Sequence, residues 1–364
     1  MDLTSIPLRK MMLKEKYREK LPEKSIIKAS SDHHAKRKPR PCGLTIHPAI
    51  GCVNQCTYCY IQDMGYNFNN ITPYGLNGTE MVYALLSNPY FMPTINGTYI
   101  AIGSVTEPFH KNVRNKTMEY IKAFEELGNP VQFSTKEYID EELARKIAQI
   151  KIPISPLITI VTLKNKNVLE PKAPDIELRI KTIRNLKAEG LKPIVFIRPI
   201  IPGITDNEAE EIIDEAKRAG AIGIVAGSLR LTKGVMERMS KAGLNVKLIR
   251  EAIEGEEAGK MKKKIMEIAE EKGLKAFPSS CCANAYVSGT TCINLCKNAI
   301  REIPKASVED VKNLIKNIIG KQVRSIIFND NSIRILMEEK LTRKEKDILK
   351  YNLRVILRRI VNIL

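Results

Sequence analysis

The 364-residue chain contains no tryptophan, and aromatic residues account for only 5% of it. It lacks any run of 18 uncharged apolar residues, so the sequence predicts no helix that crosses a membrane and no membrane partner. The first 20 residues have no apolar stretch typical of a secretion signal, and we therefore expect a cytoplasmic protein. The missing tryptophan, together with many Ile, Lys and Glu residues, favours a thermophilic source.

Acidic residues are too few to balance the basic ones, and the net charge is +18. Residues 1–41 hold 12 Lys and Arg against 5 Asp and Glu, and residues 301–364 hold 15 against 8, whereas the residues between them hold 32 against 28. Basic flanks around a nearly balanced body fit a polyanionic partner, because Lys and Arg contacts to phosphates release counterions. A Lys-rich thermophile surface is the alternative explanation.

No cysteine occurs between Cys59 and Cys281. Apart from Cys42, which we expect to be buried, the cysteines form two groups. The first group has the spacing C-x3-C-x2-C and contains Cys52, Cys56 and Cys59, and the second contains Cys281, Cys282, Cys292 and Cys296. In a cytoplasmic protein such groups are more typical of metal sites than of disulfides.

Residues 44–229 alternate between short apolar runs and amphipathic segments. The predicted strands are Leu44–Ile50, Thr98–Val105, Pro130–Thr135, Leu157–Thr162, Pro193–Pro199 and Ile222–Leu229. The predicted helices are Glu80–Leu86, Lys116–Leu127, Asp140–Ile150, Ile176–Ala188 and Asn207–Arg218. Such β–α repeats imply parallel strands with right-handed crossovers. The predicted fold class is α/β, a partial (β/α)6 TIM-like barrel with a helical, basic C-terminal extension, and functional residues are expected at the carboxyl ends of its strands.

Four segments are predicted. They are a basic lead-in (1–41), the barrel (42–240), a helix over 245–273 followed by the second cysteine group (241–300), and a basic, mostly helical tail (301–364). In the tail, Thr342 and Glu345 form a capping box that opens the last helix. Four basic residues on this helix follow strict i+4 spacing and predict a nucleic-acid-binding ridge, with a solvated face as the alternative: Lys346, Lys350, Arg354 and Arg358.

The first cysteine group directly follows the first predicted strand. Three thiolates on one loop can hold three irons of a cubane cluster and leave the fourth iron open. Zinc, with His47 as a fourth ligand, is the alternative.

This spacing, with the aromatic Tyr58 before the last cysteine, resembles the radical S-adenosylmethionine (SAM) superfamily. The resemblance implies that Cys52, Cys56 and Cys59 ligate a [4Fe–4S] cluster whose open iron binds SAM. Reductive cleavage of SAM would then give a 5′-deoxyadenosyl radical, with electrons supplied by a donor such as ferredoxin or flavodoxin.

Further motifs are similar to the spore photoproduct lyase-like branch of that superfamily. They are Gly51–Tyr60, Thr106–Phe109, Ser134–Lys136, Leu169–Pro174 with Arg179, and Pro199–Gly203 with Asp206. One departure concerns the cysteine that the lyase uses as a hydrogen donor downstream of the cluster motif, because this chain has none before Cys281. Reversal of a thymine dimer by that route is therefore not expected.

The resemblance also implies roles for individual side chains around SAM. The implied cofactor-binding residues are Tyr58, Thr106, Glu107, Ser134, Lys136, Thr159 and Thr162. Among these, Glu107 would accept from the SAM ammonium group, Lys136 would bind its carboxylate, and the two strand threonines would reach the ribose. Arg179 is interpreted as a structural partner of Glu170.

The second cysteine group has the four thiols that an auxiliary [4Fe–4S] cluster needs, and we predict such a second cluster there. A structural zinc ion or disulfides are the alternatives. The sequence as a whole predicts a radical SAM enzyme acting on nucleic acid, in tRNA modification or DNA base repair. Modification of a peptide or small metabolite is a second hypothesis, and a zinc-stabilised nucleic-acid-binding module is a third.

Overall fold

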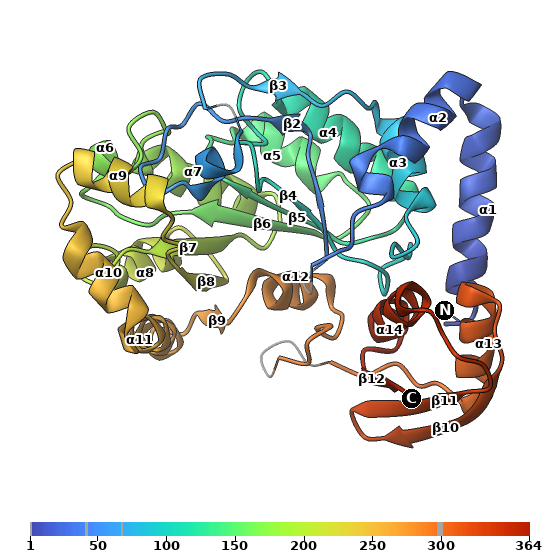
Figure 1. Ribbon diagram of the computed structural model, residues 1–364. Coiled ribbons are helices and arrows are strands. Elements are labelled where there is room, and N and C mark those ends of the chain that lie inside the picture. The colour runs from blue at the N-terminus through green and yellow to red at the C-terminus, as the bar shows by residue number, and fades with distance from the viewer. Residues whose placement is uncertain (1, 41–42, 67, 297–300) are drawn as a thin grey trace.

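A curved parallel sheet forms the centre of the computed structural model, which describes residues 2–40, 43–66, 68–296 and 301–364 (Figure 1). Cys42 lies outside the described residues. In spatial order the strands are β1 (Leu44–Ile46), β4 (Ile100–Ile102), β5 (Val131–Thr135), β6 (Ile154–Thr159), β7 (Ile194–Ile200), β8 (Gly223–Ser228) and β9 (Lys275–Phe277). All neighbouring pairs are parallel and follow sequence order, which confirms the predicted partial barrel. The seventh strand, β9, was not predicted.

Amphipathic helices cover the outer face of this sheet. They include α3 (Gly78–Ser87), α4 (Arg114–Ala123), α5 (Glu141–Ala148), α7 (Ile176–Ala188), α8 (Ala209–Arg218) and α11 (Glu257–Glu271). The five predicted helices are confirmed, with small shifts at their ends. Asn77 and Asp140 cap α3 and α5 with their side chains, and the apolar stripe of each helix is buried against the strands.

Shorter elements complete the barrel region. They are β2 (Ala49–Ile50), β3 (Thr72–Pro73), α6 (Lys166–Leu169), α9 (Lys233–Lys241) and α10 (Val246–Glu254). The helix predicted over 245–273 is in fact two helices, because Gly255 ends α10 before α11 begins. Among the described helices, none combines the length and apolar character that crossing a bilayer demands.

The lead-in folds into α1 (Ser5–Lys20) and α2 (Glu23–Ser31), which pack on α3. Helix α1 also contacts the C-terminal unit, and Leu3 and Ile6 belong to the apolar core of that unit (Figure 1). The N-terminal helices therefore join the barrel to the C-terminal unit.

The C-terminal unit contains the predicted helices and, in addition, a small sheet that was not predicted. Its elements are α13 (Val308–Ile319), β10 (Val323–Asn329), β11 (Ser332–Met337), α14 (Arg343–Leu357) and β12 (Ile360–Ile363). Strand β11 pairs antiparallel with β10 and parallel with β12. The capping box of Thr342 and Glu345 opens α14, as predicted.

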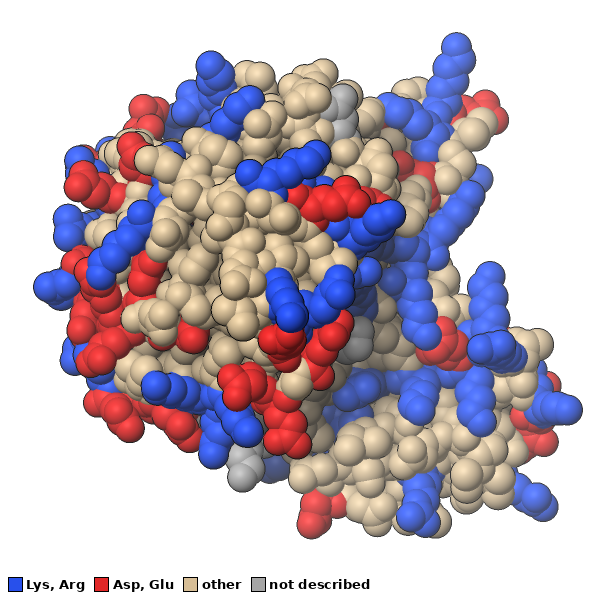
Figure 2. Space-filling model, turned by 60° about the vertical axis from the view of Figure 1, so that its left-hand side comes forward, with Lys and Arg blue, Asp and Glu red and all other residues tan. Residues whose placement is uncertain are grey.

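The prediction of a four-residue basic ridge on the last helix is wrong for two of its members. Lys346 and Lys350 are exposed, but Arg354 is half-buried and bonds to the second cysteine loop. Helix α14 ends at Leu357, and Arg358 adopts a left-handed conformation that places its side chain in the interior, 0% exposed. Figure 2 shows that basic side chains predominate over the N-terminal helices and C-terminal unit, whereas charges of both signs cover the barrel.

Helix α12 (Ser280–Ser288) covers the concave face of the sheet, between the barrel and the C-terminal unit (Figure 1). It packs on β6, and its buried side chains share one apolar cluster with Leu157, Val225 and Phe277 of the barrel and Val355 of α14. The helix thereby closes one side of the barrel interior.

Candidate active site

The first cysteine group lies on the loop between β2 and β3. Cys56 is buried, and Cys52 and Cys59 are partly buried. Thr57 donates its backbone N–H to the carbonyl of Leu169 (2.9 Å), which holds the loop against the far side of the barrel. Burial raises the pKa of Cys52 to about 11 and that of Cys56 to about 12. The thiols are therefore neutral at ordinary pH unless a metal takes the place of their protons.

A buried charge network lies directly beneath this loop. The carboxylate of Glu170 accepts hydrogen bonds from the Tyr58 hydroxyl and from Arg179, and the Lys136 Nζ is 3.8 Å from it. Arg179 is 0% exposed and also donates to the carbonyls of Thr159 (3.1 Å) and Pro174 (2.8 Å). The predicted structural role of Arg179 as the partner of Glu170 is therefore confirmed.

Burial disfavours the charge on Lys136, but the negative charges that Cys56 and Glu170 carry when ionised outweigh it and raise the pKa of the lysine above its ordinary value. The ammonium group also lies 5.7 Å from the centre of the Tyr58 ring. A permanent positive charge is thus fixed beside the cysteine loop, where it favours thiolates and any carboxylate bound next to them.

A cavity of about 480 Å³ extends from Cys59 into the barrel and ends at Ser280 on α12. Four of the predicted cofactor-binding residues line it: Tyr58, Ser134, Lys136 and Thr159. Gly103 also lines it with φ +101°, and a Cβ atom there would lie 2.4 Å from the Ser134 carbonyl oxygen. Only glycine allows β4 and β5 to approach so closely at the mouth of this cavity.

The structure places the other three predicted residues differently. Glu107 is buried, and it accepts hydrogen bonds from the Thr135 hydroxyl and from the backbone N–H of Lys136 (3.0 Å). Thr162 donates its hydroxyl proton to Glu208 (2.9 Å). The predicted contact of Thr162 with the ribose therefore has no support in the structure. Thr106 is buried, and its hydroxyl has no hydrogen-bond partner within the described structure, which leaves it available to a bound group.

Sequence reasoning missed three basic residues that line the same cavity. Arg40 precedes β1, Arg198 is on β7, and Arg230 follows β8, where its guanidinium lies 4.8 Å from the centre of the Tyr60 ring. A Cβ atom on Gly227 would lie 2.8 Å from the Arg198 side chain, so this glycine makes room for it. The available signal was an arginine near the end of each of two predicted strands.

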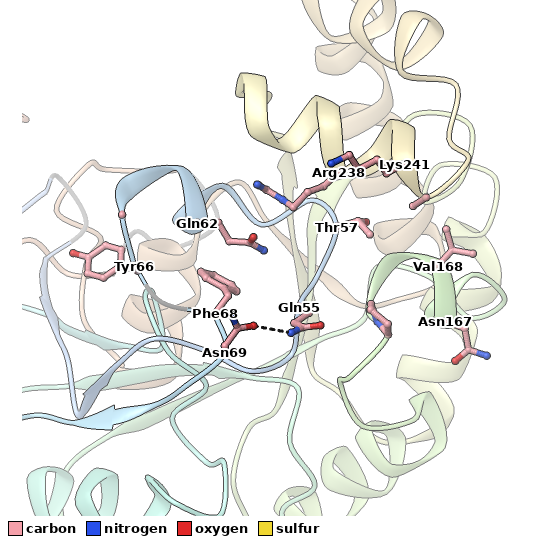
Figure 3. Close-up of a pocket in the computed structure, with 13 residues that line it drawn as sticks. Gln55, Thr57, Gln62, Tyr66, Phe68, Asn69, Asn167, Val168, Arg238 and Lys241 are labelled. Carbon is pink, nitrogen blue, oxygen red and sulfur yellow. Dashed lines mark hydrogen bonds between the residues drawn. The ribbon is translucent and has the colours of Figure 1, made fainter.

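A second cavity, of about 920 Å³, is lined by other residues of the cysteine loop and by residues of α6 and α9 (Figure 3). Gln55 of the loop donates to Asn69 across it (3.3 Å), and Arg238 and Lys241 of α9 reach its rim. Arg238 also donates to the carbonyl of Cys59 (2.7 Å) and pairs with Asp63 (3.0 Å). Helix α9 therefore holds the last cysteine of the group in place.

His47, the alternative zinc ligand, does not lie free beside the thiols. Its Nε2 is 3.1 Å from the guanidinium of Arg37, and its ring packs on that of His34. Burial and the neighbouring positive charges lower the pKa of His47 to about 3. The three cysteines are thus left as an open set of three ligands.

These features fit a [4Fe–4S] cluster with one open iron and a SAM molecule beside it. The cluster takes three thiolates, the cavity begins at Cys59, and the buried Lys136 supplies a positive charge there. The fold and site define an α/β partial barrel with a three-cysteine loop at the carboxyl ends of its strands.

Comparison with known proteins agrees with this class. Residues 46–216 match the sequence model of the radical SAM superfamily. The matched region, just under half of the chain, is similar to the radical SAM domain. The fold is similar to that of a spore photoproduct lyase variant, with a TM-score of 0.55 and 16% identity over 66% of this chain and 78% of that one.

Curated relatives share the same region at low identity. The chain is 22% identical to the uncharacterized protein ORF301 of Acidianus two-tailed virus, over 48% of this chain and 60% of that protein. It is 27% identical to the uncharacterized protein MJ0683 of Methanocaldococcus jannaschii, over 47% of this chain and 65% of that protein. The chain thus spans less than two thirds of the length of either relative.

The second cysteine group is brought together as predicted, but with an unexpected spacing. The Cys292 sulfur is 3.8 Å from that of Cys282 and 4.0 Å from that of Cys281. These separations are too long for disulfides, whose sulfurs are about 2.05 Å apart.

Proposed function

We propose that this protein is a radical SAM enzyme that modifies a nucleic acid. The observation that supports the substrate class is the charge of the 480 Å³ cavity that begins at Cys59. Four basic residues line it, namely Arg40, Lys136, Arg198 and Arg230, and no Asp or Glu is among the described residues that do so. Such a lining favours a ligand that carries phosphates, in addition to the carboxylate of SAM.

The roles of the protein's own residues follow from their positions. Cys52, Cys56 and Cys59 would hold the cluster, and Lys136 would bind the SAM carboxylate beside it. A cluster and SAM held there would supply the radical chemistry that removes a hydrogen atom from the substrate. Glu170 and Arg179 keep Tyr58 and the cysteine loop fixed, and Ser134 and Thr159 are placed to contact the rest of SAM.

A nucleotide would enter the cavity past Tyr60. The Tyr60 ring, against which Arg230 lies, offers a flat surface for a base, and Arg198 offers a positive charge for a phosphate. The only thiol among the described residues that line the cavity is Cys59, a cluster ligand. The reaction therefore has to end without a hydrogen-donor cysteine in that lining, which favours modification of tRNA over a lyase-type repair of DNA.

An electron donor such as ferredoxin or flavodoxin is proposed to bind at the cavity of Figure 3. Residues of the cysteine loop line that cavity, and Lys241 adds a positive charge to it beside the Arg238–Asp63 pair. Acidic electron carriers would be attracted there, next to the loop that carries the three cysteines.

Release of 5′-deoxyadenosine tests the enzymatic proposal. Anaerobically reconstituted protein with SAM and a chemical reductant should form it, and Cys56→Ala should not. A cluster-loaded sample that releases none would contradict the proposal.

Binding of RNA and duplex DNA tests the substrate class. We expect affinity to fall steeply with salt, and Arg198→Ala with Arg230→Ala to weaken binding at least tenfold. The control is Lys263→Ala, an exposed residue of α11 far from the cavity lining. Equal affinity in all variants, or no binding in dilute buffer, would favour the peptide or small-metabolite hypothesis. The hypothesis of a zinc-stabilised binding module leaves the radical SAM domain without a role.

A further inference from the structure

The second cysteine group forms a compact set of sulfurs beneath the barrel. Cys281 and Cys282 are in the first turn of α12, and Cys292 is on the loop that follows it. The three sulfurs lie within 4.8 Å of one another, and all three side chains are buried. The Cys296 thiol lies within hydrogen-bonding reach of Cys282 and Cys292 but outside this set of three.

The spacing of these sulfurs matches one shared metal ion. Two zinc–sulfur bonds of about 2.3 Å at a tetrahedral angle place the sulfurs about 3.8 Å apart. The separations here are 3.8 Å for Cys282–Cys292 and 4.0 Å for Cys281–Cys292. In a cubane cluster each thiolate binds a different iron, so the sulfurs are pushed considerably farther apart.

Groups that can donate hydrogen bonds surround these sulfurs. Both Cys281 and Cys282 are at the N-terminus of α12, where the helix dipole stabilises negative charge. The Ser279 hydroxyl is 3.0 Å from the Cys281 sulfur and 3.2 Å from the Cys282 sulfur. Asn294 donates an N–H to Cys281 (3.6 Å), so the group has the outer hydrogen bonds typical of a metal site.

A buried arginine near the group has no acidic partner among the described residues. Arg358 is 0% exposed, and its described hydrogen bonds go only to the backbone carbonyls of Asn96 and Gly97. Its Nε and Nη1 have no hydrogen-bond partner within the described structure, and its charge interacts with Cys292. Isolated buried charges are costly, and a divalent ion with four thiolates has a net charge of −2 that would offset this one.

We propose that Cys281, Cys282, Cys292 and Cys296 bind one zinc ion in a structural, four-thiolate site, in place of a second iron–sulfur cluster. Zinc is the metal that a closed tetrahedral set of thiolates most commonly holds. The ion ties α12 to the loop after it, and Arg354 of α14 ties that loop to the C-terminal unit through Ile293 (3.2 Å) and Asn294 (2.9 Å). Ser280 of α12 lines the cavity that begins at Cys59. The same ion would therefore hold this wall of the cavity in place.

Metal analysis of anaerobically purified, reconstituted protein tests the proposal independently of activity. The wild type should hold about four irons and one zinc per chain. Cys292→Ser should lose the zinc and keep the iron, whereas its matched counterpart Cys56→Ser should lose the iron and keep the zinc. Eight irons without zinc, a fifth iron in place of zinc, or zinc that persists in Cys292→Ser would each overturn the proposal.

A second measurement covers the case in which Cys292→Ser does not fold. Cobalt exchanged into Cys56→Ser, which has no cluster, should bind at one ion per chain with the absorption of a tetrahedral thiolate complex. Arg354→Ala should release zinc to a chelator several-fold faster than wild type, whereas Lys350→Ala, exposed on the same helix, should not. An octahedral cobalt spectrum, or equal release from both variants, would contradict the proposed site.

Discussion

Replacing Glu170 with glutamine tests how the cysteine loop is held. Glutamine keeps the shape and can still accept from Tyr58 and Arg179, so the main loss is the negative charge. Glu170 is fully buried, and although burial raises its pKa, the charges of Arg179 and Lys136 bring it below its ordinary value. The folded protein therefore depends on the ionised form.

Without that charge, two buried cations face each other with no counter-charge from this site. Removing one partner of a buried ion pair costs about 3–5 kcal/mol, and we expect Glu170→Gln to lower the free energy of unfolding by that amount. The assay is equilibrium urea unfolding under anaerobic conditions, with iron measured in each sample. Cluster retention should fall as well, because Tyr58 is next to Cys59.

Glu142→Gln is the matched control, since that carboxylate is 75% exposed and pairs with Lys146 only at the surface. It should cost less than about 1 kcal/mol. Arg179→Met added to Glu170→Gln should cost less than the sum of the two single changes, because the second change removes an unpaired charge. A loss below about 1 kcal/mol for Glu170→Gln, or strict additivity, would refute the reasoning.

Three further predictions concern other parts of the chain. Gly103→Ala should lower the free energy of unfolding by at least about 2 kcal/mol, because its Cβ would lie 2.4 Å from the Ser134 carbonyl oxygen. The control Gly203→Ala has φ +80° but no atom within 4 Å of the added Cβ, and it should cost about 1 kcal/mol in the same urea assay. Burial raises the pKa of Glu137 from 4.5 to about 7, so the unfolded chain releases this proton at lower pH than the folded chain. The free energy of unfolding should therefore fall as pH rises from 4.5 to 7. Glu137→Gln should flatten that slope, and an unchanged slope would contradict the reasoning. Thr342→Ala should cost about 1 kcal/mol in thermal or urea unfolding, because it removes the capping box of α14, and no change would mean that this helix end is held by other contacts.

The repeating pattern of apolar runs and amphipathic segments predicted the barrel strands and helices correctly because both depend on local periodicity. The short strand β9 was missed because only three residues form it, and pairing with β8 creates it. The sheet of the C-terminal unit was missed for a similar reason, since β12 follows a long helix without a clear break in the pattern. The position of β12 beside β11 depends on contacts between residues about 28 positions apart in sequence.

By itself, the sequence determined the class of chemistry. Three closely spaced cysteines after a strand are a local arrangement that the sequence alone reveals. Three thiols cannot all pair as disulfides, and a closed zinc site needs a fourth ligand, whereas a [4Fe–4S] cluster with an open iron needs three. Only the tertiary structure decided which polar residues face the cavity and which basic residues are exposed. Burial and hydrogen bonding separate Thr159 from Thr162 and Lys350 from Arg358, although the members of each pair were predicted on the same strand or helix. It also decided the distances between sulfurs from α12 and its loop, which depend on how these segments pack between barrel and C-terminal unit.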